Sequence, residues 1–152
     1  MSNLPTGLLI DAFALLGCLF AFWKGGTAER TTAVVIFINV AINESAKYLM
    51  PSGDNVVRLV NDGLTAVILL GVTLRYGAPW MGAVMLFYAA QFAMHSYYLV
   101  MQLPNDFWHA LINNINFSGT TWCLIIGAAV SWRRRVRLAR QATGVPGRGA
   151  AP

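Results

Sequence analysis

The sequence predicts an all-α integral membrane protein, a bundle of five transmembrane helices with its N-terminus outside and its C-terminus in the cytoplasm. The prediction comes from an apolar composition, five apolar runs of spanning length, and basic residues gathered on one side. Of 152 residues, 57% are hydrophobic and only 11% are charged, and the mean hydropathy is +0.55. Because a soluble domain carries about 25% charged residues, this composition excludes an ordinary soluble enzyme domain, a disordered chain and a disulfide scaffold.

Each of the five apolar runs is long enough to cross a bilayer, whose hydrocarbon core of about 30 Å needs roughly 20 helical residues. Proline and glycine clusters such as Pro51-Ser52-Gly53 separate the runs, as helix stops do. The first run lacks a basic leader and a cleavage site, so we interpret it as a retained span. The loops are short, which predicts antiparallel neighbours. The predicted spans are 4–23, 30–50, 55–76, 80–103 and 107–132, giving a transmembrane domain, 1–132, and a basic, Gly/Pro-rich cytoplasmic tail, 133–152.

Basic residues are concentrated on one side of the predicted bundle. The loop from Lys24 to Arg30, the loop after Arg75 and the tail share that side, whereas the opposite loops hold almost none. By the positive-inside rule the basic side is cytoplasmic, and we expect a multi-pass protein of the bacterial inner membrane. The tail is basic and contains no acid, so we expect it to bind anionic lipid rather than nucleic acid. The expected lipid contacts are Arg133, Arg134, Arg135, Arg137 and Arg140.

Polar side chains recur in every predicted span at steps of three and four residues, which places them on one face of each helix. Counted at 1.5 Å per residue from the outer helix ends, most of the ionisable ones lie about 9–12 Å deep. The inner halves of the spans are almost purely apolar. Because such a polar stripe is expected to face the bundle interior, the sequence predicts an outward-facing polar pocket closed beneath by a hydrophobic plug. The candidate ligand-binding or proton-handling residues are Asp11, Asn43, Glu44, Lys47, Arg58, Asp62, Gln91, His95 and Asn113.

The candidates divide by charge into ligand groups and counter-charges. The carboxylates and His95 are expected to bind a ligand or protons, with Lys47 and Arg58 as counter-charges, because an unpaired buried charge costs several kcal/mol. Arg58 precedes Asp62 by four residues, a spacing that allows pairing on a helix. The same polar groups are also consistent with structural contacts between helices, at about 0.6 kcal/mol per hydrogen bond. The sequence leaves both interpretations open, although structural contacts alone give no reason to avoid the inner half.

Neither catalysis nor a cofactor is predicted. The sequence contains no nucleophile elbow, zinc-protease, P-loop or dinucleotide-binding motif, so we expect a non-enzymatic protein. Shared haem ligands would lie at equal depth, but His95 is placed about 12 Å deep by the helical rise and His109 near the outer end. We therefore interpret His109 as an interfacial residue and expect no metal site. Cys18 and Cys123 lie in apolar runs and are interpreted as small buried hydrophobes.

The predicted function is to bind a small polar ligand, ion or proton, or to help it pass. The alternative is an accessory subunit of a larger membrane complex, because small residues such as Gly71 and Gly82 permit close helix contact. A holin-like oligomeric pore is a minor alternative, which the apolar inner half disfavours. We expect a homo-oligomer or a larger complex, because a bundle this small has few residues with which to bury its own interior.

Overall fold

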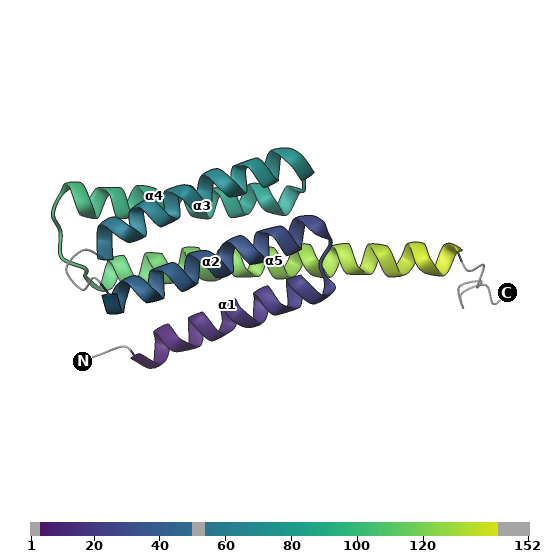
Figure 1. Ribbon diagram of the computed structural model, residues 1–152, viewed down its shortest axis with the longest axis horizontal. Helices are drawn as coiled ribbons and strands as arrows, with labels where there is room; N and C mark the ends of the chain where they lie inside the picture. Colours follow the sequence, from purple (N-terminus) through teal and green to yellow (C-terminus); the bar gives the residue numbers. More distant parts are fainter. Residues whose placement is uncertain (1–3, 50–53, 143–152) are drawn as a thin grey trace.

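The computed structural model describes residues 4–49 and 54–142, and within these ranges the chain is all-helical, with five helices and no strand (Figure 1). Every helix end except the last lies within three residues of its predicted position. The helices are α1 (Leu4–Lys24), α2 (Thr27–Leu49), α3 (Asp54–Tyr76), α4 (Pro79–Val100) and α5 (Phe107–Ala142).

The helices alternate in direction and close into a ring in chain order. Each helix packs against its neighbours in the sequence, and α1 packs against α5 to complete the ring. Helix α2 also touches α5 across the bundle. The α1–α2 and α3–α4 connections and the C-terminal end of α5 lie at one end of the bundle, which we call the tail end. The start of α1 and the α4–α5 loop lie at the other end, the loop end (Figure 1).

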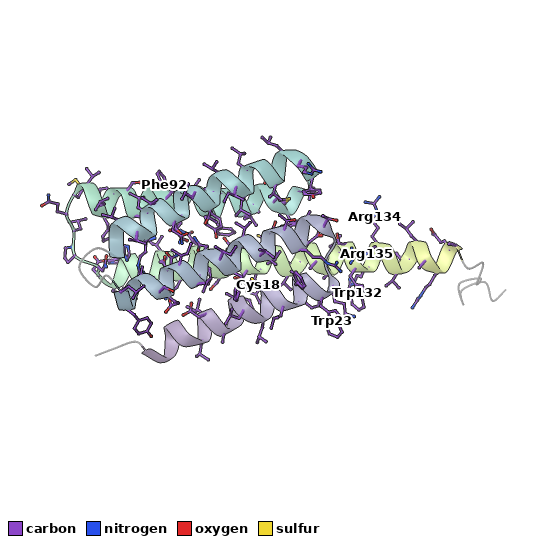
Figure 2. The ribbon with its side chains drawn as sticks, viewed as in Figure 1. Cys18, Trp23, Phe92, Trp132, Arg134 and Arg135 are labelled. Atoms are coloured by element: carbon purple, nitrogen blue, oxygen red, sulfur yellow. The ribbon has the colours of Figure 1, made fainter. Side chains whose placement is uncertain are left out.

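Helix α5 is ten residues longer than the predicted span, which ended at Trp132. It continues to Ala142, so Arg134, Arg135 and their neighbours project beyond the bundle on an unbroken helix (Figure 2). No proline or glycine follows Gly127 before Gly144, and arginine, leucine and alanine are strong helix formers. Residues 133–142, which we predicted as the first part of the tail, are therefore a continuation of α5, and residues 143–152 lie outside the described part.

Helix α4 ends three residues before its predicted end. The N–H of Met101 still donates to the Tyr97 carbonyl at 3.0 Å, but Gln102 adopts a left-handed φ of 52° that no helix continues through. The loop then leads to Asp106, whose carboxylate accepts a hydrogen bond from the His109 N–H at 2.8 Å. This contact satisfies one of the unpaired donors of the first turn of α5.

The interior is apolar toward the tail end and polar toward the loop end. Many large apolar side chains instead face outward; Leu16 and Leu19, for example, are each 65% exposed. Soluble proteins show the opposite distribution, since their buried polar residues are few. Two apolar clusters fill the tail-end half, one of Cys18, Ala21, Ala33, Ile36, Leu124 and Ala128, and one of Leu69, Val84 and Tyr88. The buried polar residues include Asn39, Asn61, Asp62, Gln91, His95 and His109.

Two glycines on α5 allow aromatic rings of α4 to approach its backbone. A Cβ atom at Gly119 would lie 2.4 Å from the Phe87 ring, and one at Gly127 would lie 2.6 Å from the Trp80 ring. Both distances are below any real carbon–carbon contact. The close packing of α4 on α5 therefore requires glycine at these positions.

One stretch among the described residues, Val56–Tyr76 of α3, is long and apolar enough to cross a membrane, with a mean hydropathy of 1.6. Gln91 and His95 are polar residues within α4 that lower the hydropathy of that helix. The predicted all-α fold of five helices is confirmed for the described chain, whereas five membrane spans are not.

Candidate functional site

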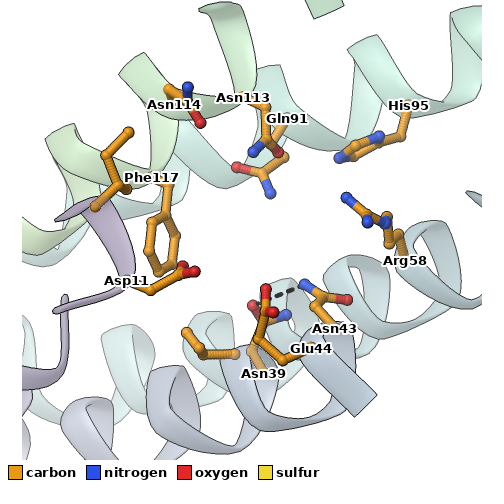
Figure 3. Close-up of a pocket in the computed structure, with 12 residues that line it drawn as sticks. Asp11, Asn39, Asn43, Glu44, Arg58, Gln91, His95, Asn113, Asn114 and Phe117 are labelled. Atoms are coloured by element: carbon orange, nitrogen blue, oxygen red, sulfur yellow. Dashed lines mark hydrogen bonds between the residues drawn. The ribbon is translucent and has the colours of Figure 1, made fainter. Parts of the chain in front are cut away.

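A polar cavity of about 100 Å³ opens within the loop-end half of the bundle (Figure 3). Every described helix contributes to its wall, and the wall is mostly amide and charged side chains. A water molecule occupies about 30 Å³ in the liquid, so the cavity has room for a few waters or one small ion. It is lined by Ile10, Asp11, Asn39, Val40, Asn43, Glu44, Arg58, Gln91, His95, Asn113, Asn114 and Phe117.

The polar stripes predicted from sequence meet at this cavity. Of the nine candidate residues, Asp11, Asn43, Glu44, Arg58, Gln91, His95 and Asn113 line it. Asp62 lies just beneath the lining, bonded to it and fully buried. Lys47 belongs to α2, but its side chain is outside the described part of the structure. The convergence arises because the ring closes with each polar face turned inward.

Asp62 joins three helices at the floor of the cavity. Its Oδ1 accepts a hydrogen bond from Asn39 Nδ2 at 3.0 Å, and its Oδ2 accepts one from Gln91 Nε2 at 3.0 Å. The same Oδ2 lies 3.3 Å from Nε2 of His95. A buried carboxylate is tolerated only when such donors replace water, and here α2 and α4 supply them to α3.

An amide network fixes α2 against α3 beside this floor. Asn39 Nδ2 also donates to Thr65 Oγ1 at 3.0 Å, and Asn61 Nδ2 donates to the Asn39 carbonyl at 2.9 Å. Asn61 Nδ2 lies 3.0 Å from its second acceptor, Asn43 Oδ1. Asn39 and Asn61 were absent from our candidate residues, although both lie on the polar stripes. Their hydrogen bonds hold the cavity wall in one arrangement.

His95 and His109 are hydrogen bonded to each other, contrary to the sequence interpretation of His109 as interfacial. Nδ1 of His95 lies 3.2 Å from Nε2 of His109, and the ring centroids are 5.1 Å apart. Both residues are buried. The prediction counted depth from residue 103, but α4 ends at Val100, so His95 is about 4.5 Å shallower than it assumed at 1.5 Å per residue. The two rings therefore meet at similar depth.

Asp106 marks the surface end of this histidine pair, in the loop before α5. Its Oδ1 accepts from the His109 N–H and from the Tyr98 hydroxyl, each at 2.8 Å. These two hydrogen bonds hold the pKa of Asp106 below its usual value because they stabilise the charged form, and the bond from the His109 backbone N–H has the larger effect. The Tyr98 ring packs edge-on against His109, with centroids 4.7 Å apart. The loop and the pair are therefore one connected unit.

A second buried acid, Glu29, lies at the tail end of the bundle and was not among our candidates. It is only 4% exposed, and its two oxygens accept hydrogen bonds from Ser131 Oγ and the Gly26 N–H, both at 2.8 Å. The Arg135 guanidinium donates to the Lys24 carbonyl nearby. These contacts hold the projecting part of α5 against the α1–α2 connection. The one sequence signal for this site was that Glu29 is an isolated acid in a loop whose other charged residues are basic.

The chemistry available at the cavity is hydrogen bonding, charge pairing and proton exchange. Cys18 is a buried free thiol, as predicted, and Cys123 is a free thiol that is only half-buried. In the described ranges no group of three or more His, Cys, Asp or Glu side chains could hold a metal ion. No family model, curated protein or solved structure matches the chain, so the site is interpreted from its own geometry.

Proposed function

We propose that this chain is a five-span protein of the bacterial inner membrane, with its N-terminus outside and its C-terminus in the cytoplasm. Its inverted polarity supports this proposal: Leu16, Leu19 and Phe22 face outward while Asp62 and His95 are buried. An apolar outer surface of this extent is far larger than soluble monomers expose. In a bilayer the same surface would contact lipid, and the polar residues would face the bundle interior.

The pocket, in this proposal, binds a small polar ligand, ion or proton, or helps it pass, and acts without catalysis. The observation that carries the proposal is the polar cavity itself, to which every described helix contributes. Among the described side chains at the cavity and its floor, Asp11, Glu44 and Asp62 outnumber the single guanidinium of Arg58. Carboxylates on the cavity wall are suitable ligands for a cation, and the volume of about 100 Å³ favours a small one.

Binding from one side fits the cavity better than an open pore. The apolar clusters around Ile36, Leu69 and Leu124, each at most 1% exposed, fill the bundle on the tail-end side of the cavity. Water and ions cross such packed apolar regions only at high cost. A holin-like lesion is therefore the less suitable interpretation of this bundle.

Cation binding is tested by thermal unfolding of the protein in lipid nanodiscs with lithium, sodium, potassium or ammonium chloride. Choline chloride at equal ionic strength controls for screening. A cation that fits raises the melting temperature, because a ligand at a hundred times its Kd stabilises the folded state by about 2.7 kcal/mol. Asp11→Asn should reduce the shift, whereas Asp106→Asn, a carboxylate outside the cavity, should not. Equal shifts for every salt, choline included, would contradict the proposal.

The second candidate function is an accessory subunit of a larger membrane complex. One observation favours it: Gly71 of α3 and Gly82 of α4 are exposed, and a Cβ at either would meet nothing within 4 Å. Small exposed residues allow another transmembrane helix to approach closely. Native mass spectrometry of the C-terminally tagged protein, extracted gently from its own membrane, separates the two. Stoichiometric larger subunits support the accessory role; a monomer or homo-oligomer that carries a small extra mass supports the pocket.

The projecting part of α5 is proposed to lie at the cytoplasmic surface on anionic lipid. Trp23 and Trp132 lie where α5 leaves the bundle (Figure 2), and the Lys24 ammonium stands 4.2 Å and 5.2 Å from their ring centres. Tryptophan and lysine are typical of the membrane–water interface. Basic groups just beyond such a belt attract anionic headgroups, at about 1 kcal/mol each. The groups concerned are Arg133, Arg134, Arg135, Arg137 and Arg140, all exposed.

A further inference from the structure

A continuous line of titratable groups leads from the cavity floor to the α4–α5 loop. Asp62 Oδ2 lies 3.3 Å from His95 Nε2, and the opposite nitrogen of that ring, Nδ1, lies 3.2 Å from His109 Nε2. His109 is in the first turn of α5, and its backbone N–H donates to Asp106 in the exposed loop. The titratable groups are therefore spaced at or near hydrogen-bond distance from the buried carboxylate of Asp62 to the ring of His109 in the first turn of α5.

An imidazole bridged at both nitrogens can accept a proton at one while releasing a proton from the other. With Asp62 protonated, its O–H donates to His95 Nε2, and His95 Nδ1–H donates to His109 Nε2. With Asp62 ionised, both hydrogen bonds reverse: His109 Nε2–H donates to His95 Nδ1, and His95 Nε2–H donates to Asp62. Every contact in the line is satisfied in both states, so the distances between these atoms fit either one.

We propose that Asp62, His95 and His109 form a proton path that exchanges protons between the cavity floor and the loop-end surface. The path deepens the proposed function and rests on it, because a cation in the cavity and a proton on Asp62, which lies just beneath the lining, repel each other. When a cation enters, Asp62 gives its proton to His95 Nε2, His95 gives the proton on Nδ1 to His109 Nε2, and His109 gives the proton on its own Nδ1 to a solvent water molecule at the loop end. One proton leaves, one positive charge arrives, and the charge of the site is unchanged.

Other charged and titratable groups surround this path on every helix that packs there. Arg58 shares the cavity wall with His95 from α3, Glu44 faces the cavity from α2, and Asp11 faces it from α1. Tyr98 and Asp106 contact His109 from the loop side. Among the described side chains of the wall, two carboxylates thus accompany one guanidinium. Their fields act on both states of the path.

The chain contains two histidines in all, so labelling histidine with ¹⁵N gives a spectrum of these two rings alone. We expect both rings to change tautomer together, at one midpoint, when pH is varied in nanodiscs. In Asp62→Asn the concerted change should disappear, while Asp106→Asn should retain it. Separate midpoints for the two rings in the wild-type protein, or a concerted change that survives in Asp62→Asn, would overturn the proposal.

A second variant distinguishes a proton path from a purely structural contact. In His109→Gln the amide can still donate to His95 Nδ1, but it cannot pass a proton on. We expect this variant to fold with a melting temperature close to that of the wild-type protein, and to slow the protonation of Asp62 after a pH jump, followed by the carboxyl stretch in infrared spectra. An unchanged rate in the folded variant would count against the path.

The failure of the path and the failure of the cation pocket give different results. If a cation competes with the proton, the midpoint of the concerted change should fall by about one pH unit for each tenfold rise in cation concentration above its Kd. Sodium chloride is the first probe, with choline chloride as the control. If the midpoint of the concerted tautomer change is the same in sodium, lithium, potassium and ammonium chloride, the proton path is supported and the cation pocket is contradicted. If the melting temperature depends on the cation but no concerted tautomer change occurs, the cation pocket is supported and the proton path is contradicted.

Discussion

The imidazoles of His95 and His109 lie 3.2 Å apart although fourteen positions and a reversal of the chain separate the two residues. This contact fixes the end of α4 against the first turn of α5, next to the loop that joins them. A slip of either helix by one residue, about 1.5 Å along its axis, would break it. The register of the two helices and the connection between cavity and surface are therefore set by the same pair.

Removing the acceptor at Asp62 should destabilise the fold. Asp62→Leu leaves Asn39, Gln91 and His95 without their common partner in a buried site, and each unsatisfied donor costs about 1–3 kcal/mol. Asp62→Asn keeps one oxygen acceptor and should cost less. Reversible unfolding in bicelles measures the difference. Leu64→Ala, on the exposed face of the same helix, is the control, and a Leu variant as stable as this control would contradict the role given to Asp62.

Alanine at Gly127 should weaken the packing of α4 on α5. The added methyl group would meet the Trp80 ring at 2.6 Å, and overpacking of this kind typically costs about 1–3 kcal/mol. Gly82→Ala is the matched control, because nothing lies within 4 Å of its Cβ position and the helix gains up to about 1 kcal/mol in propensity. The unfolding midpoints of the two variants should move in opposite directions; equal shifts would show that the ring is not held there.

The contribution of Asp106 to stability should depend on pH. Its pKa in the folded protein is lowered, so its stabilising effect is fully present above the unfolded-state pKa of about 3.9 and is lost as pH falls through the lower folded value. Asp106→Asn keeps a capping oxygen without the titration. The melting temperature of the wild-type protein should exceed that of the variant at neutral pH and approach it in acid. A difference that does not change with pH would show that the charge is not involved.

Loss of Glu29 should release the projecting part of α5 from the bundle. Glu29→Ala leaves Ser131 Oγ and the Gly26 N–H without their acceptor, and because both donors are only partly buried we expect a cost at or below about 1 kcal/mol for each. Trypsin should then cut more quickly among the arginines beyond Trp132. Glu44→Gln, an acid at the far end of α2, is the control. Unchanged cleavage in Glu29→Ala would show that Arg135 and the Lys24 carbonyl suffice to hold the helix.

Reporter fusions test the five-span topology. A fusion at the C-terminus and one inserted in the 104–106 loop should report opposite sides of the membrane, with the C-terminus cytoplasmic. The two fusions should differ because α5, a helix long enough to cross the membrane, lies between the 104–106 loop and the C-terminus. Two fusions that report the same side would contradict the topology, and the polar cavity would then need another interpretation.

The helices were predictable because their signals are local. Apolar runs, proline and glycine stops and helical spacing fixed nine of the ten helix ends to within three residues. The end of α5 was missed because the prediction stopped the span at the change from apolar to basic side chains, although no residue there breaks a helix. Chain polarity marks where a membrane would end, which is a different property from where the backbone hydrogen bonds end.

The sequence was enough to name most of the residues that line the cavity, but it was not enough to show which of them contact one another. Steps of three and four placed Asp11, Gln91 and Asn113 on inward faces without showing which residues meet. Asn39 and His109 escaped because their importance depends on partners from other helices, Asp62 and His95. Such contacts depend on the order of helices around the ring and on their relative heights. Here an error of three residues at the end of α4 was enough to separate two rings that touch.

Helix α5 also has a mechanical consequence. Its 36 residues extend over about 54 Å at the helical rise, well beyond a hydrocarbon core of about 30 Å. Asn113 on the cavity wall and Arg137 on the projecting part are therefore two points on one rigid rod. The cavity wall and the exposed arginines are therefore joined by one continuous run of helical hydrogen bonds, so a displacement of the arginines would act directly on the helix that carries Asn113.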